Sequence, residues 1–204
     1  TLRCYEMFLG PLEQHKPWEP KGIEGVHRFL RKFWGLYHGQ DRFEVSENPA
    51  SEEAHKALNK FIKKVHHDID RLSFNTVVSE CMILTNRLIE LNCREREILE
   101  PFVIAISPYA PHVAEELWEK LGNDSSVCFT KFPEVDEQYL IENSVNYPIS
   151  FNGKVRYTLE FSTDASKEDI ESAVLSNEKS ERWLEGKSPK KVIVVPNKIV
   201  NVVV

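Results

Sequence analysis

Basic residues recur at helical spacing in one stretch of the sequence, and they have the clearest chemical use. Lysine and arginine can neutralise the phosphates of a nucleic acid when they are spaced along a ridge. On a helix that advances about 100° per residue, five basic positions fall within about 80° of one another. They are Lys56, Lys60, Lys64, His67 and Arg71, and Arg28, Arg31 and Lys32 repeat the pattern upstream. The alternative interpretation is an ordinary solvated helix face.

A second basic group follows a turn in the last quarter of the chain. Lys154 and Arg156 alternate with apolar residues, so on a strand both would point away from the core. Asn152 and Gly153, directly before them, are typical of a two-residue hairpin turn. Weaker candidates for the same kind of contact are Lys190, Lys191 and Lys198. The alternative is that these cations only protect exposed strand edges from pairing.

No residue pattern for catalysis or metal binding stands out. The sequence lacks the glycine-rich nucleotide loops, the His-Glu-x-x-His zinc motif and the Gly-x-Ser-x-Gly nucleophile motif. Four scattered cysteines without a Cys-x-x-Cys pair are expected to be reduced thiols: Cys4, Cys81, Cys93 and Cys128. We therefore predict no catalytic residue, no metal site and no cofactor in this chain, and the cytoplasm as its compartment.

The distribution of charge refines the nucleic-acid hypothesis. The 204 residues contain 26 Lys and Arg against 32 Asp and Glu, and the net charge of −6 argues against indiscriminate coating of nucleic acid. Residues 146–204 contain 9 basic and 8 acidic side chains, so the acidity resides in residues 1–145. Cations gathered on particular faces of such a chain suit contact with one folded RNA in a few places.

Helices in the first part of the chain must position these residues. Apolar residues at helical spacing predict helices over 26–37, 51–72, 74–91 and 98–106, and a short helix that ends at Gly122. Ser51 is expected to cap the second of them. Pro101 is expected in the first turn of the fourth, which is apolar nearly all round and should be buried. Short connections favour antiparallel packing.

The last part of the chain changes to a period of two. It predicts strands over 147–151, 155–161, 192–195 and 199–204, with a capped helix over 164–175. The polar, proline-containing stretch 132–137 is expected to link two domains, 1–135 and 146–204. The predicted fold class is α+β and multidomain: an antiparallel α-helical bundle followed by a small ββαββ module.

The sequence also suggests a piece of a longer, non-membrane protein. No apolar run approaches the roughly 18 residues that a membrane-spanning helix needs. The first residues include neither an initiating Met nor the apolar core of a signal peptide. We therefore expect no membrane partner.

Several stretches resemble bacterial-type leucyl-tRNA synthetases. The stretch that follows the catalytic domain of these enzymes is similar to residues 5–14, 16–18, 22–26 and 28–30. The helical bundle that leucyl, isoleucyl and valyl enzymes share resembles residues 74–76, 108–112 and 115–118. Residues 152–156 and 191–204 are similar to the C-terminal module of the leucyl enzymes, although Asn197 stands where that family often has glycine. The resemblance covers essentially the whole chain.

The resemblance implies that residues 1–135 are an anticodon-binding-type bundle with the preceding stem-contact segment, and that residues 146–204 are a tRNA-binding module that reaches the elbow of leucine tRNA. The implied function is to position leucine tRNA for ATP-dependent leucylation and editing. The catalytic domain, which uses ATP with Mg, and the editing domain would lie elsewhere in a monomeric parent enzyme. Recognition would depend on RNA shape and backbone contacts.

The tRNA-binding interpretation ranks the candidate residues and leaves two alternatives open. Lys154 and Arg156 are favoured in the module. Lys56, Lys60, Lys64 and Arg71 are favoured in the bundle, ahead of Arg28 and Arg31. The first alternative is the equivalent region of an isoleucyl or valyl enzyme, which residues 152–156 and the last strands argue against. The second is a non-catalytic protein-interaction module, whose apolar interface would respond little to salt.

Overall fold

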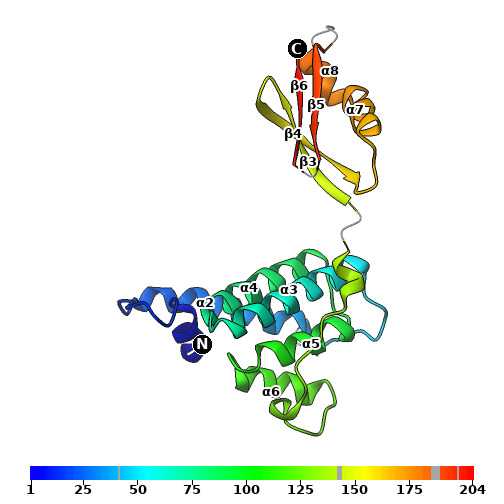
Figure 1. Ribbon diagram of the computed structural model, residues 1–204. Coiled ribbons are helices and arrows are strands. Elements are labelled where there is room, and N and C mark those ends of the chain that lie inside the picture. The colour runs from blue at the N-terminus through cyan, green and yellow to red at the C-terminus, as the bar shows by residue number, and fades with distance from the viewer. Residues whose placement is uncertain (41, 142–143, 185–188, 197) are drawn as a thin grey trace. The chain divides into compact units, whose positions relative to one another are not determined.

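The computed structural model describes residues 1–40, 42–141, 144–184, 189–196 and 198–204 of the chain (Figure 1). The chain divides into two compact units, Thr1–Leu140 and Ile141–Val204. Each unit is described by itself below. Asn197, noted above for its departure from the glycine of similar sequences, lies outside the described residues.

The first unit is built almost entirely from helices. The longer ones are α2 (Ile23–Leu36), α3 (Glu52–Asp70), α4 (Phe74–Glu90), α5 (Arg96–Ile106) and α6 (Pro111–Lys120). Shorter elements are α1 (Leu2–Phe8), the 3-10 turns η1 (Pro20–Gly22), η2 (Val127–Phe129) and η3 (Glu137–Leu140), and a ribbon of β1 (His38–Gly39) and β2 (Arg42–Phe43). The five helices predicted from periodicity are confirmed.

Aromatic side chains join the helices at the centre of the first unit. The ring of Phe102 on α5 stands edge-on to Phe33 of α2, with centroids 4.9 Å apart, and to Phe61 of α3 at 5.2 Å. Tyr37, fully buried after α2, donates a hydrogen bond to the carbonyl of Leu99 on α5 at 2.9 Å. Edge-on ring pairs contribute about 0.5–1.5 kcal/mol each beyond the burial of area. The burial predicted for α5 is confirmed.

The position predicted for Pro101 is wrong. Helix α5 begins at Arg96, so Pro101 lies in its interior and not in its first turn. Proline has no N–H group, so the carbonyl of Glu97, one turn earlier, does not receive the usual helical hydrogen bond. The prediction failed because it placed the start of the helix at Ile98, the first apolar residue. The helix already includes the two polar residues before it, Arg96 and Glu97.

The stretch expected to link two domains packs on the helices. Phe132 and Val135 contact the core of the first unit. The amide of Asp136 donates a hydrogen bond to Oδ1 of Asn59 on α3 at 2.7 Å, and Asn59 is buried. Residues 132–140, which we call the docked segment, therefore belong to the first unit.

The second unit is a four-stranded sheet with two helices against one face (Figure 1). Its strands are β3 (Ser144–Phe151), β4 (Lys154–Ser162), β5 (Lys191–Val195) and β6 (Ile199–Val203), and its helices are α7 (Lys167–Leu175) and α8 (Glu178–Leu184). The strand order is β4-β3-β6-β5, with β3 and β6 parallel and the other neighbours antiparallel. The predicted α+β class is confirmed, and α8 is an addition to the expected ββαββ order.

The core of the second unit follows from strand periodicity and helix capping. Tyr147, Ile149 and Phe151 alternate along β3 and are buried with apolar residues of α7 and β6. Helix α7 begins after Ser166, which forms a capping box with Asp169. The cap therefore lies two residues after the expected start of this helix.

The turn between β3 and β4 has the predicted conformation. Asn152 and Gly153 have φ values of 49° and 81°, as the two central residues of a type I′ hairpin turn require. Oδ1 of Asn152 accepts a hydrogen bond from the amide of Val204 at 3.2 Å, and the amide of Gly153 donates to Oδ1 of Asn201 at 3.0 Å. The turn is therefore tied to the last strand as well as to its own hairpin.

Replacing Gly153 by alanine is expected to lower the free energy of unfolding of the second unit by about 1 kcal/mol, because a Cβ is unfavourable at positive φ. The matched control is Gly35→Ala inside α2, where alanine should add about 0.5–1 kcal/mol of stability. At both positions the new Cβ meets open space, so backbone conformation alone sets the sign. Amide hydrogen exchange at increasing urea concentration measures the free energy of unfolding of each unit separately. Effects of the same sign would contradict this account.

Candidate nucleic-acid interface

The basic positions of α3 form a ridge on the outside of the first unit. We call Lys56, Lys60, Lys64, His67 and Arg71 the α3 ridge. The hydroxyl of Ser51 accepts a hydrogen bond from the amide of Ala54 at 3.2 Å and so fixes the start of the helix, as predicted. Phe61 and Ile62 turn into the core. Lys60 and Arg71 are exposed, whereas Lys56 and Lys64 are partly buried.

The α3 ridge carries its own carboxylates. Nζ of Lys56 lies 2.6 Å from Oε1 of Glu52, and Lys64 forms an ion pair with Asp68. Both pairs join residues four apart on the helix, where side chains of opposite charge meet. The ridge is therefore a row of mixed charge, in which carboxylates accompany the cations that the sequence predicted for this face.

Asp68 lies near the C-terminal end of α3 and holds one lysine of the α3 ridge. Its side chain is buried and accepts hydrogen bonds from Lys64 and from Oγ1 of Thr76 on α4, the latter at 2.5 Å. Burial alone raises the pKa of Asp68, but these hydrogen bonds and the positive charge of Lys64 outweigh it and hold that pKa below its ordinary value of 3.8. Asp68 is therefore a carboxylate at neutral pH, and it holds Lys64 in place.

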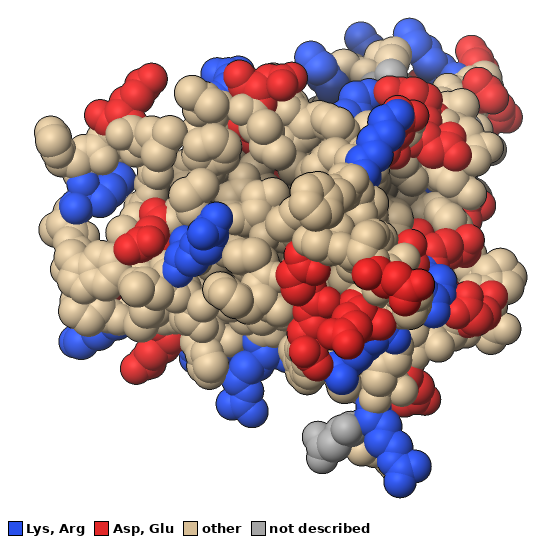
Figure 2. All heavy atoms as spheres, turned by 90° about the horizontal axis from the view of Figure 1, so that it is seen from below, with Lys and Arg blue, Asp and Glu red and all other residues tan. Residues whose placement is uncertain are grey.

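The arginines of α2 occupy a separate surface element. Arg28 and Arg31 are exposed on the side of α2 away from its buried residues Val26, Phe29 and Leu30. Nζ of the neighbouring Lys32 donates a hydrogen bond to Oδ1 of Asn86 on α4 at 3.0 Å. Figure 2 shows basic and acidic side chains interspersed on the face that it presents, with a group of carboxylates near the centre. A surface of mixed charge does not favour indiscriminate coating of nucleic acid.

Three lysines of the second unit lie at one end of the sheet. Lys154 pairs with Phe151 beside the turn, and Lys191 pairs with Val203 at the start of β5. The amide of Lys190 donates to the carbonyl of Val203 at 2.8 Å, which places Lys190 at the same end. Lys198 follows β5 at the opposite end. We call Lys154, Lys190 and Lys191 the sheet-end lysines, and all of them are exposed.

The orientation predicted for Arg156 is wrong. The register between β3 and β4 shifts between Ile149 and Ser150, so that Tyr157 pairs with Ile149 and Val155 pairs with Ser150. Arg156 is the extra residue of this β-bulge, and a bulge changes the direction of side chains. Its guanidinium lies 3.9 Å from the ring centroid of Trp183 on α8, which covers the core side of the sheet. Arg156 and Lys154 therefore do not project together from the far face of the sheet, and Val155 is 58% exposed.

Two residues of α8 that contact β4 were missed by the sequence analysis. Trp183 lies under the guanidinium, and Nζ of Lys179 lies 6.0 Å from the ring centroid of Tyr157. Both Trp183 and Lys179 belong to α8, a short polar helix that has no clear apolar period. The available signal was an aromatic residue in an otherwise charged stretch, which suggests a tertiary contact but not its partner.

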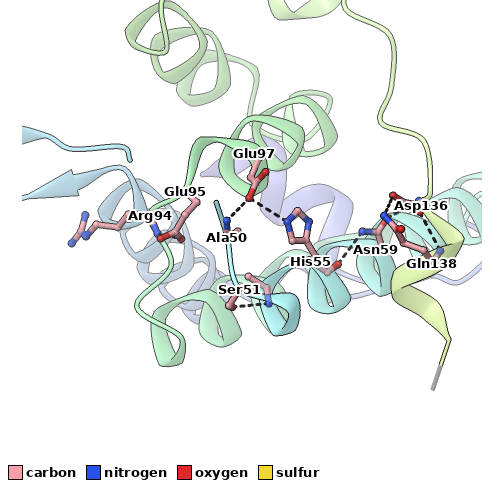
Figure 3. A network of polar contacts seen from close by, with 10 residues as sticks. Ala50, Ser51, His55, Asn59, Arg94, Glu95, Glu97, Asp136 and Gln138 are labelled. Carbon is pink, nitrogen blue, oxygen red and sulfur yellow. Dashed lines mark hydrogen bonds and ion pairs between the residues drawn. The ribbon is translucent and has the colours of Figure 1, made fainter. Parts of the chain in front are cut away.

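A polar network holds the docked segment against the helices (Figure 3). Nε2 of His55 on α3 lies 3.2 Å from Oε1 of Glu97 on α5, and the His55 ring stacks on Tyr139 at 4.4 Å. Asn59 donates to the carbonyl of His55 at 2.9 Å and accepts from the amide of Asp136. The network joins α3, α5 and the docked segment, so these groups serve to position the end of the first unit.

Metal-ligating residues and membrane-spanning helices were sought among the described residues. In that part of the chain, no group of three or more His, Cys, Asp or Glu side chains could hold a metal ion. The cysteines there are free thiols, with Cys4, Cys81 and Cys93 buried and Cys128 exposed. None of the helices described has the length and apolar character needed to cross a membrane.

Most of the helices of the first unit fall within the match to a known domain family. A family model described as the anticodon-binding domain of tRNA ligase matches residues 52–172, more than half of the chain. The chain belongs to this family. The anticodon-binding domain family therefore accounts for α3 to α6 and for the first part of the second unit.

Relatives of this anticodon-binding chain include leucine–tRNA ligases. That of Christiangramia forsetii is 58% identical over 203 residues and that of Bacteroides thetaiotaomicron 56% identical over 205 residues. Both comparisons cover 100% of this chain but 21% and 22% of the relative, so the chain spans about a fifth of their length. A solved LeuRS from Agrobacterium radiobacter K84, in a ternary complex with tRNA and LeuAMS, matches with a TM-score of 0.73 and 27% identity over 99% of this chain and 28% of that one.

These findings confirm the resemblance stated from the sequence. The likeness to leucine–tRNA ligases extends over the whole chain, including the strands that the sequence analysis used to separate leucyl from isoleucyl and valyl enzymes. The isoleucyl and valyl alternatives, and that of a protein-interaction module, are not favoured.

Replacing Asp68 by asparagine is expected to lower the free energy of unfolding by about 1–2 kcal/mol at pH 7, because Lys64 and Thr76 lose a charged acceptor. The folded-state pKa of Asp68 is below its ordinary value, so the stabilisation is complete above pH 3.8 and disappears as the pH falls through the lowered pKa. Urea unfolding at several pH values measures the difference.

The matched control is Asp70→Asn, an exposed carboxylate on the same helix, which should change the free energy of unfolding by less than about 0.5 kcal/mol. A loss for Asp68→Asn that stays constant from pH 7 to pH 2.5 would contradict a role for the carboxylate charge.

Proposed function

We propose that this chain is the tRNA-binding portion of a leucine–tRNA ligase. It positions leucine tRNA while domains outside these 204 residues carry out ATP-dependent leucylation and editing. The observation that carries the proposal is the similarity of the whole chain to leucine–tRNA ligases, at 58% and 56% identity. The similar LeuRS structure was determined in complex with tRNA, which supports the same partner for this chain.

In the first unit, we assign contact with the RNA backbone to exposed cations. Lys60 and Arg71 stand on the α3 ridge and Arg28 and Arg31 on α2, and all four side chains are accessible to a ligand. Phosphates would compete with Glu52 for Lys56 and with Asp68 for Lys64. The buried, doubly hydrogen-bonded Asp68 is the stronger competitor, so Lys64 is the weaker of the two candidates.

In the second unit, the sheet-end lysines are the candidates for contact with the tRNA elbow. Lys154, Lys190 and Lys191 bring three positive charges to one end of a rigid sheet. Charges fixed on a sheet can meet phosphates of a folded RNA at defined positions without reading bases. Lys198 lies at the opposite end and would need a different part of the RNA.

The remaining partners follow from the same proposal. ATP with Mg would be bound by the catalytic domain of the parent enzyme, outside these 204 residues. The catalytic and editing domains of that enzyme, together with leucine tRNA, are the proposed partners. A monomeric enzyme of the cytoplasm, without a membrane partner, is the corresponding expectation.

The proposal predicts a strong dependence of leucine tRNA binding on salt. Each phosphate contact contributes about 0.7–0.9 to the slope of log affinity against log salt. Lys191→Ala should weaken binding and reduce that slope by roughly one contact, because a sheet-end lysine no longer releases a counterion. Filter binding of the 204-residue chain to leucine tRNA between 50 mM and 200 mM salt measures both quantities.

The matched control is Lys167→Ala, which removes an exposed lysine from α7, away from the sheet-end lysines. It should leave affinity and slope close to those of the parent chain. Binding that ignores salt, or that fails to distinguish leucine tRNA from a non-cognate tRNA, would overturn the proposed function and favour a protein partner.

A further inference from the structure

We propose that Arg156, stacked on Trp183, forms a preorganised clamp for an RNA phosphate on the helix side of β4. The inference rests on the proposed function, because it takes tRNA as the ligand and assigns one further contact in the second unit. The site differs from the sheet-end lysines in its chemistry, since its arginine lies over the face of an aromatic ring.

The β-bulge of β4 creates the site. With a regular register, Arg156 would stand on the opposite face of the sheet from Tyr157. The extra residue between the Tyr157–Ile149 and Val155–Ser150 pairs brings the Arg156 side chain to Trp183, on the same side as Tyr157. Bulges often redirect a side chain next to a functional site. Here the redirected residue is an arginine on an edge strand, within reach of a large ligand.

The stack on Trp183 leaves the hydrogen-bonding edge of Arg156 available. A guanidinium carbon 3.9 Å from the indole centroid places the cation over the face of the ring. The N–H groups of a guanidinium lie in its plane and point outward, in a fork that matches two phosphate oxygens. Arg156 is exposed and Trp183 is 36% exposed. The indole thus limits the motion of the side chain without occupying its donors.

A chain of hydrogen bonds attaches α8, the helix that carries Trp183, to its neighbours. The hydroxyl of Ser180, which is fully buried, donates to the carbonyl of Val174 at 2.5 Å. The Tyr157 hydroxyl must therefore be the donor in its 2.5 Å hydrogen bond to Ser180. This chain fixes α8 against α7 and β4, one helical turn from Trp183. The backbone that carries the Trp183 ring is thereby attached to β4 and α7.

Lys179 supplies a second positive charge on the same helix. Its Nζ lies 6.0 Å from the ring of Tyr157, the residue after Arg156. Glu178 and Glu181 belong to the same helix, so the clamp is not part of a broadly basic surface. A site of this kind attracts little nucleic acid by charge alone, and it favours an RNA whose phosphate meets the arginine fork in the right geometry.

The test compares the affinity of the 204-residue chain for leucine tRNA among five variants. Arg156→Lys keeps the charge but loses the planar fork, and should weaken binding roughly fivefold to tenfold. Trp183→Leu should cause a similar loss, and Trp183→Phe should stay within about twofold of the parent chain because it keeps an aromatic face. The double variant Arg156→Ala/Trp183→Leu should bind no more weakly than Arg156→Ala, because Trp183 acts through Arg156.

Controls separate this inference from folding and from the proposed function. Hydrogen exchange of β4 and α8 must be unchanged in Trp183→Leu, and Arg156→Lys tests the fork without altering the helix. If the parent chain binds leucine tRNA and both Arg156→Lys and Trp183→Leu bind equally well, the clamp is refuted and the proposed function stands. If the parent chain does not bind leucine tRNA, the proposed function fails first. Binding to polyglutamate is measured in parallel as a stand-in for an acidic protein. If the Arg156 and Trp183 variants lose affinity for polyglutamate but keep their affinity for leucine tRNA, the site is assigned to an acidic protein and the clamp is refuted.

Discussion

The burial of α5 between α2 and α3 is the interaction on which the first unit depends. This helix is apolar on nearly all sides, so it is stable only where other helices cover it. Phe102 meets this need through ring contacts with Phe33 and Phe61. The contact with Phe61 turns one side of α3 inward and thereby leaves the α3 ridge on the surface. Core packing, and not attraction between charges, therefore decides where the cations of α3 lie, since exposed ion pairs contribute little.

Sequence periodicity predicted the parts of this protein that short-range physics determines. The helices of the first unit, the Ser51 cap and the turn at Asn152 and Gly153 depend on residues close together in the chain. The β-bulge at Arg156 depends on how β4 pairs with β3, and no residue type marks it. Helix α8 depends on contacts of Ser180 and Trp183 with other elements. The ion pairs of the α3 ridge did have a local signal, because acids stand four residues from Lys56 and Lys64, and attention to the cations alone overlooked them.

The cations of the second unit occur in two physical forms. The sheet-end lysines are exposed on flexible stems, and such side chains adapt to a ligand but lose conformational entropy on binding. Arg156 has already lost much of that freedom to Trp183. A surface with both kinds can adjust to an RNA at one end of the sheet and impose geometry beside α8. In the proposed function, this division lets a unit with nearly equal numbers of acidic and basic side chains contact RNA at a few defined positions.

The parallel pairing of β3 with β6 has a consequence for how the protein folds. These two strands are neighbours in the sheet, yet Ile149 pairs with Val200, so nearly the whole second unit lies between the paired residues. Before two strands so far apart in sequence can pair, the chain between them must form a long closed loop, which costs conformational entropy. Their pairing is therefore slower than helix formation between nearby residues. The helical unit, whose neighbours α3 and α4 are consecutive in sequence, is able to fold while the sheet is still open. On a ribosome, the sheet can close only after β6 has left the exit tunnel.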